Sequence, residues 1–171
     1  IDAAALQKRL DDGELVLLSP LGYSPTGEVF NLALEDVAAS TAITLKAEKL
    51  IFLMDTAGVT GRRGELLRNL TVRQAQALLA RPDAGENDVP LYLPWAVRAC
   101  EHGVKRAHLV SGHIDDGLLL ELFTHKGVGT LVTPDPLETL RHAKIEDIGG
   151  VLRLLEPLEA AGILVQANRD L

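Results

Sequence analysis

The sequence has little cysteine, few aromatic residues and no long apolar run, and these shortages exclude whole classes of protein. The single cysteine, Cys100, excludes an internal disulfide framework and a cysteine-rich zinc site. The longest apolar runs, such as residues 50–54, are far too short to cross a bilayer. The 17 Lys and Arg against 24 Asp and Glu give a net charge of −7, which argues against a nucleic-acid partner. We expect a cytoplasmic protein with no membrane segment and no metal site.

The composition that remains is that of a folded domain. The chain has 171 residues, and 47% of them are hydrophobic, which is enough to build a buried core. The first residue is Ile1 rather than methionine, and residues 166–171 stop in a polar stretch. We therefore expect a piece of a longer protein.

Apolar runs alternate with helical patterns along the first 133 residues. Short apolar runs predict buried strands at 14–19, 49–54, 106–110 and 130–133. Helical spacing or capping residues predict helices at 2–12, 30–47, 71–81, 89–103 and 114–123. Asp2 is the expected N-cap of the first helix, and Thr71 and Gln74 have the spacing of a capping box. Within 89–103, Pro94 suggests that the helix proper starts near that residue. The alternation predicts βαβ units, a parallel sheet and an α/β sandwich, with ligand sites beyond the carboxyl ends of the strands.

The pattern changes after Pro134 to Pro136. A helical stripe of apolar residues starts near Ile145, Pro157 is expected to break it, and Gly162 ends a short second helix. We expect a first domain over 1–141 and the opening of a second domain over 142–171.

Two residues in this pattern could carry ligand chemistry. His108 falls within a predicted buried strand, where a polar ring needs hydrogen-bond partners. Glu121 follows three leucines on an apolar helix, so its carboxylate is either solvated or directed at a cationic ligand. The pattern alone favours the solvated face. The five histidines include no pair at the i, i+4 spacing of a helical zinc site.

Two loops are weaker candidates. Gly22, Ser24 and Gly27 could cradle a phosphate, but their spacing is that of neither a P-loop nor a dinucleotide turn, and a plain turn is the better interpretation. Residues 55–58 follow a predicted strand and fit a small-ligand site or an ordinary turn equally well. Cys100 is interpreted as a small core residue.

Three stretches resemble a known family. Residues 103–133 (GVKRAHLVSGHIDDGLLLELFTHKGVGTLVT) resemble the C-terminal lobe of the amino-acid kinase fold, as in acetylglutamate kinases and N-acetylglutamate synthases. Residues 18–59 resemble the nucleotide-side region of the same lobe. Residues 142–165 resemble the start of the GNAT acetyltransferase domain that follows this lobe in the bacterial synthases. The order of the two parts is typical of the synthase family.

The resemblance implies a fold and a function. The fold is an αβα sandwich with a parallel sheet, of the amino-acid kinase (carbamate kinase-like) type. The full-length protein would transfer an acetyl group from acetyl-CoA to L-glutamate, the first step of arginine biosynthesis. In the family, the kinase-like domain builds a homo-oligomer and binds L-arginine, the inhibitor. No catalytic residue and no cofactor are then expected in this chain.

The resemblance also assigns the arginine site. The matching positions are His108, Glu121, Gly127 and Gly129. A carboxylate can take a guanidinium in a two-pronged charge-assisted hydrogen bond, and glycines let backbone groups approach a ligand closely.

An acetylglutamate kinase fragment is the alternative. Kinases of this fold carry an Asn-x-Asn-Ala-Asp-like motif, but residues 31–35 read Asn-Leu-Ala-Leu-Glu here, and Trp95 stands where the kinases have a lysine. Phosphoryl transfer needs a cation on the developing charge, so these departures favour the synthase. A free-standing amino-acid-binding module would require the protein to end at Leu171.

Overall fold

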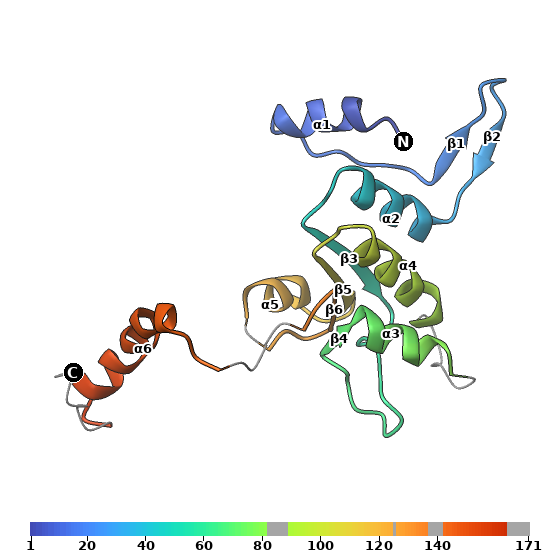
Figure 1. Ribbon diagram of the computed structural model, residues 1–171. Coiled ribbons are helices and arrows are strands. Elements are labelled where there is room, and N and C mark those ends of the chain that lie inside the picture. Colours follow the sequence, from blue (N-terminus) through green and yellow to red (C-terminus); the bar gives the residue numbers. More distant parts are fainter. Residues whose placement is uncertain (82–88, 125, 137–141, 164–171) are drawn as a thin grey trace. The chain divides into compact units, whose positions relative to one another are not determined.

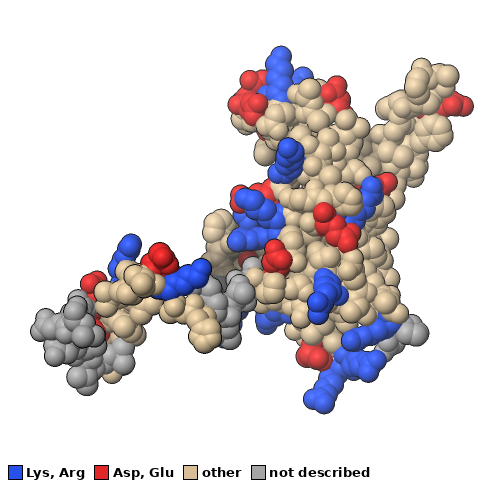
Figure 2. Space-filling view, viewed as in Figure 1, with Lys and Arg blue, Asp and Glu red and all other residues tan. Residues whose placement is uncertain are grey.

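The computed structural model describes residues 1–81, 89–124, 126–136 and 142–163. The chain divides into two compact units, Ile1–Leu137 and Glu138–Leu171. No helix in the described ranges is long and apolar enough to span a membrane. Acidic and basic side chains are interspersed on the visible surface of the first unit (Figure 2).

The first unit is built on a four-stranded sheet with the order β3-β5-β6-β4. These strands are β3 (Lys49–Met54), β5 (Arg106–Ser111), β6 (Thr130–Thr133) and β4 (Asn69–Thr71). The β3/β5 and β4/β6 pairs are parallel, whereas β5 and β6 are antiparallel, so the sheet is mostly parallel rather than wholly parallel as predicted. The helix between β5 and β6 has seven residues. A helix of this length spans only about 10 Å, which is too short to carry the chain back along the whole of β5. The chain therefore enters β6 at the same end of the sheet at which it left β5, and the two strands are antiparallel.

Helices cover both faces of this sheet and form the predicted αβα layers (Figure 1). On one face lie α2 (Leu34–Thr44), α3 (Val72–Leu79) and α4 (Val89–Glu101). They pack over alternate strand residues, which form the apolar core with the inner helix faces: Leu50, Phe52, Met54, Ala107, Leu109 and Val132. The opposite face carries α5 (Gly117–Phe123), which packs on β5.

The N-terminal helix and the third helix begin at the predicted capping residues. In α1 (Ala3–Asp11), the Asp2 carboxylate accepts a hydrogen bond from the Ala5 amide. Before α3, the Thr71 hydroxyl and the Gln74 side chain form the expected capping box. Each cap satisfies backbone N–H groups that the first helical turn cannot pair.

The predicted strand over 14–19 is wrong. These residues form no strand, Leu15 and Leu17 are 101% and 97% exposed, and no strand within the described residues pairs with them. The region expected to be a loop instead contributes to an antiparallel hairpin of β1 (Leu21–Tyr23) and β2 (Val29–Asn31). The turn at Gly27, with φ +87°, closes this hairpin. Because Phe30 pairs in β2, the helix predicted over 30–47 begins only at Leu34.

Two prolines lie inside helices that continue through them, contrary to prediction. Pro94 lies within α4, and the carbonyl that it leaves unpaired belongs to exposed Pro90 in the first turn. In the second unit, a 3₁₀ turn (Ile145–Asp147) leads into α6 (Ile148–Ala160), which contains Pro157 without a break. Neither element of the second unit has a buried residue. The predicted opening of a GNAT domain at residue 142 stays a prediction.

Candidate ligand site

His108 stands on the central strand, on the face opposite the apolar core. Its neighbours Ala107 and Leu109 are completely buried beneath the helical layer, and strand alternation places His108 on the α5 side. The residue is 4% exposed. The expectation that a buried ring in this strand needs a polar partner is confirmed, because its Nδ1 lies 2.9 Å from Glu121 Oε1.

Glu121 is buried, so the solvated-face interpretation is wrong. The residue is 8% exposed, whereas the three preceding leucines, Leu118 to Leu120, are 39–55% exposed. The short helix α5 therefore turns its carboxylate toward β5 and its leucines outward. Burial of a carboxylate requires partners, and His108 is the first of them.

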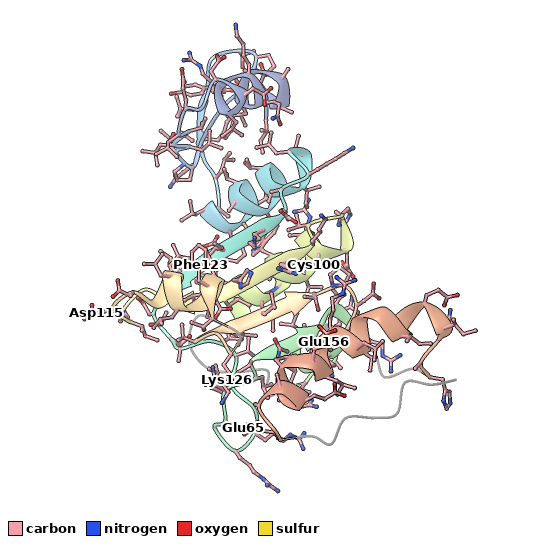
Figure 3. The ribbon with its side chains drawn as sticks, turned by 90° about the vertical axis from the view of Figure 1, so that its left-hand side faces the viewer. Glu65, Cys100, Asp115, Phe123, Lys126 and Glu156 are labelled. Carbon is pink, nitrogen blue, oxygen red and sulfur yellow. The ribbon has the colours of Figure 1, made fainter. Side chains whose placement is uncertain are left out.

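The turn between α5 and β6 supplies the other partners of Glu121. Its Oε2 accepts hydrogen bonds from the backbone N–H of Val128 at 2.8 Å and of Gly129 at 2.9 Å. The structure thus brings together all four residues singled out in the sequence: His108, Glu121, Gly127 and Gly129. In Figure 3, the labels Phe123 and Lys126 mark the last residue of α5 and the residue just before Gly127.

Neither Gly127 nor Gly129 has room for a side chain. Gly127 has φ +59°, and a Cβ there would collide with Oε2 of Glu121. A Cβ on Gly129 would collide with the backbone carbonyl oxygen of Leu109. The glycines therefore let the turn approach both the carboxylate and the central strand.

The Glu121 carboxylate is held ionised. Burial alone raises its pKa, but the hydrogen bonds from His108 and from the Gly129 and Val128 amides outweigh burial and leave the pKa below its ordinary value. Because the carboxylate accepts, the Nδ1 of His108 must donate. A neutral ring with its proton on Nδ1 has a bare lone pair on Nε2.

The second ring nitrogen of His108, Nε2, is the atom of the site that lacks a partner in the described part of the chain. His108 Nε2 is buried and has no hydrogen-bond partner within the described residues. A buried polar atom without a partner is uncommon and costs free energy, which points to a ligand contact. With the Nδ1 proton donated to Glu121, an acceptor at Nε2 beside an ionised carboxylate would suit a ligand that carries N–H donors and a positive charge.

Sequence reasoning missed three contributors around this turn. The Val128 amide donates to Glu121, and Arg68 Nη1 donates to the Gly127 carbonyl oxygen at 2.8 Å. Buried Thr130 receives the Val59 amide on its hydroxyl oxygen at 2.9 Å. Backbone contacts and contacts between residues distant in sequence leave no motif that spacing could show.

Two other sequence candidates belong to other parts of the fold. Ser24 and Gly27 lie in the turn of the N-terminal hairpin, as the plain-turn interpretation predicted, whereas Gly22 lies in strand β1. Cys100 (labelled in Figure 3) lies in the core, as predicted, and burial raises the pKa of its thiol to about 11. Over the described ranges, no group of three or more His, Cys, Asp or Glu side chains could hold a metal ion.

The fold agrees with that of known proteins. The model of the amino acid kinase family matches residues 1–111, and the chain belongs to that family. An amino-acid acetyltransferase of Ralstonia nicotianae (strain ATCC BAA-1114 / GMI1000) is 48% identical over 171 residues, which make up 100% of this chain and 38% of the relative.

Two solved structures of an N-acetylglutamate synthase are also similar to this chain. N-acetylglutamate synthase from Neisseria gonorrhoeae, complexed with coenzyme A and L-arginine, matches with a TM-score of 0.83 and 36% identity over 99% of this chain and 38% of that one. Its complex with coenzyme A and N-acetyl-glutamate matches with a TM-score of 0.74 and 38% identity over 98% of this chain and 39% of that one. The chain therefore spans well under half the length of these relatives.

Proposed function

We propose that this chain is the arginine-sensing part of an amino-acid N-acetyltransferase, which transfers an acetyl group from acetyl-CoA to L-glutamate. The relative from Ralstonia bears the name amino-acid acetyltransferase, and the synthase from Neisseria was crystallised with coenzyme A and L-arginine and, separately, with coenzyme A and N-acetyl-glutamate. On this proposal, the acetyl-CoA site and the catalytic residues belong to the rest of the full-length protein. L-Arginine, the end product of the pathway, is the inhibitor.

The unpartnered Nε2 of His108 is the observation that carries this proposal. Arginine's guanidinium presents five N–H donors and no acceptor. In a neutral imidazole with its proton on Nδ1, Nε2 offers only a lone pair, and those donors would complement it. The adjacent ionised Glu121 supplies the negative charge that a buried cation requires.

Glu121 has limited capacity left for such a ligand. A carboxylate offers about four acceptor positions, and three are occupied, by His108, Val128 and Gly129. The remaining position on Oε1 can take one guanidinium N–H. The two-pronged bond expected from the resemblance would need one of these internal contacts to open, so we propose a single-pronged contact shared with His108 Nε2.

Kinase activity is the less favoured function. Phosphoryl transfer requires cations around the transferred group, but Ala33, Glu35 and Trp95 stand where the kinase motif residues would be. Trp95 packs half-buried in α4, with the Arg98 guanidinium 5.2 Å from its ring centroid. We also propose that the full-length protein is a cytoplasmic homo-oligomer and that this chain belongs to its regulatory and oligomerisation domain.

The full-length protein tests the proposal in two assays. With acetyl-CoA and L-glutamate we expect release of coenzyme A, inhibited by L-arginine and not by L-citrulline, in which a neutral urea replaces the guanidinium. With ATP and N-acetylglutamate we expect no phosphoryl transfer. Phosphorylation of N-acetylglutamate would establish the kinase alternative. Equal inhibition by L-citrulline would show that the site does not recognise the positive charge of the guanidinium.

A further inference from the structure

The turn that binds Glu121 is also held from its other side. Arg68 Nη1 lies 2.8 Å from the carbonyl oxygen of Gly127 and 3.4 Å from that of Lys126. Arg68 precedes β4, and its own carbonyl accepts a hydrogen bond from the Leu131 amide at 2.8 Å. Its backbone is therefore fixed at the sheet while its side chain reaches the turn. In Figure 3, Lys126 marks that turn beside the loop that leads into β4.

One peptide unit carries both contacts. The peptide that joins Gly127 to Val128 donates its N–H to the Glu121 carboxylate and accepts the Arg68 guanidinium on its carbonyl oxygen. A cation at the oxygen end polarises the peptide and strengthens its N–H as a donor. The orientation of this unit thus couples an exposed arginine to a buried carboxylate.

We infer that Arg68 is a positioning residue of the proposed arginine site. It holds the 127–128 peptide so that Glu121 keeps its acceptors directed at the amides and at His108, and so that His108 Nε2 stays available to the ligand. The inference rests on the proposed function, because arginine inhibition is the property that Arg68 adjusts. Arg68 does not itself contact the ligand.

The geometry favours an arginine over a lysine at position 68. A single Nη1 donor reaches two successive carbonyl oxygens, those of Lys126 and Gly127, because the planar guanidinium fixes the direction of its N–H groups. A lysine would keep the charge but spread its donors around a flexible ammonium. It should therefore restore part of the effect and not all of it.

Inhibition curves of full-length variants test the inference, each relative to that variant's own activity without L-arginine. Arg68→Gln should raise the half-inhibitory concentration of L-arginine by about three- to tenfold, the range expected when a residue acts through another. Arg68→Lys should raise it by about twofold. Arg73→Gln is the matched control: it removes the same charge from an exposed residue of α3 whose side chain has no hydrogen bond to the part of the chain that the structure describes, and it should leave the value unchanged.

A double-mutant cycle separates positioning from a general loss of stability. In a Glu121→Gln background, Arg68→Gln should add less than about twofold, because the carboxylate that the peptide serves is gone. Full additivity, or an unchanged curve for Arg68→Gln or for Arg68→Lys, would overturn the inference. A wild-type enzyme that L-arginine does not inhibit would overturn the proposed function itself. If Arg68→Gln fails to fold, Arg68→Lys against wild type decides the question.

Discussion

The two faces of the central strand β5 serve different purposes. Ala107 and Leu109 are completely buried in an apolar layer and make no polar side-chain contacts. His108, between them, is almost as buried but lies in a polar cluster with Glu121 and the 127–129 turn. One strand therefore stabilises the fold through one face and, on the proposed function, senses a ligand through the other. A substitution should change stability or arginine response according to its face.

The largest effect on stability is expected on the apolar face. Leu109→Ala should cost about 2–5 kcal/mol, because Leu109 is completely buried and helices packed over the sheet cannot fully close the cavity. Thermal melting of the full-length protein measures this loss. Below the melting transition, the half-inhibitory concentration of L-arginine should be unchanged. Leu53→Ala, at a residue 58% exposed on β3, is the control and should melt close to wild type. A large shift in arginine response without a shift in melting would break the division between faces.

Gly127→Ala should affect both properties moderately. The left-handed backbone at φ +59° should cost about 1 kcal/mol for a residue with a Cβ, and that Cβ would also displace the Glu121 carboxylate. Gly64→Ala is a suitable control, since Gly64 has φ +78° but nothing near its Cβ position. Both variants should lose melting temperature, but only Gly127→Ala should respond more weakly to L-arginine. Equal arginine responses in the two variants would count against the turn as part of the site.

The smallest effect is expected on the acid side of the stability curve. Since the folded-state pKa of Glu121 lies below its unfolded value of about 4.3, the ionised carboxylate stabilises the fold above that pH. This stabilisation is lost as the pH falls through the folded-state pKa. Glu121→Gln has no such group to titrate, so wild type should lose melting temperature faster than this variant between pH 5 and pH 3. Parallel curves would mean that Glu121 titrates as it does in the unfolded chain.

The sequence was a good guide where burial and capping determine structure. The strands at 49–54, 106–110 and 130–133 lie in the sheet, because continuous apolar runs in them meet helices or neighbouring strands. The run at 14–19 has the same composition but forms no strand, since pairing depends on a neighbour that pattern cannot reveal. The three-residue β4 carries too few residues to show a period.

The site could be predicted only in part. His108 was identifiable because a polar ring in an apolar strand demands a partner. That Glu121 is this partner depends on how α5 turns over β5, thirteen residues along the chain, and the local pattern of three leucines pointed to solvent instead. Arg68 lies 59 residues from Gly127, and its contact is with a carbonyl oxygen that every residue possesses. Side-chain type alone could not have indicated it.

The central claim is that Glu121 and His108 form the arginine site, and Glu121→Gln in the full-length enzyme tests it most directly. Removing the charge while keeping the shape deletes a charge-assisted contact worth about 1.5–3 kcal/mol, so the half-inhibitory concentration of L-arginine should rise by about ten- to a hundredfold. Glu48→Gln, which makes the same chemical change at an exposed ion pair with Lys105, should leave it unchanged. Melting curves confirm that both variants are folded. An unchanged half-inhibitory concentration in a folded Glu121→Gln enzyme would contradict the account.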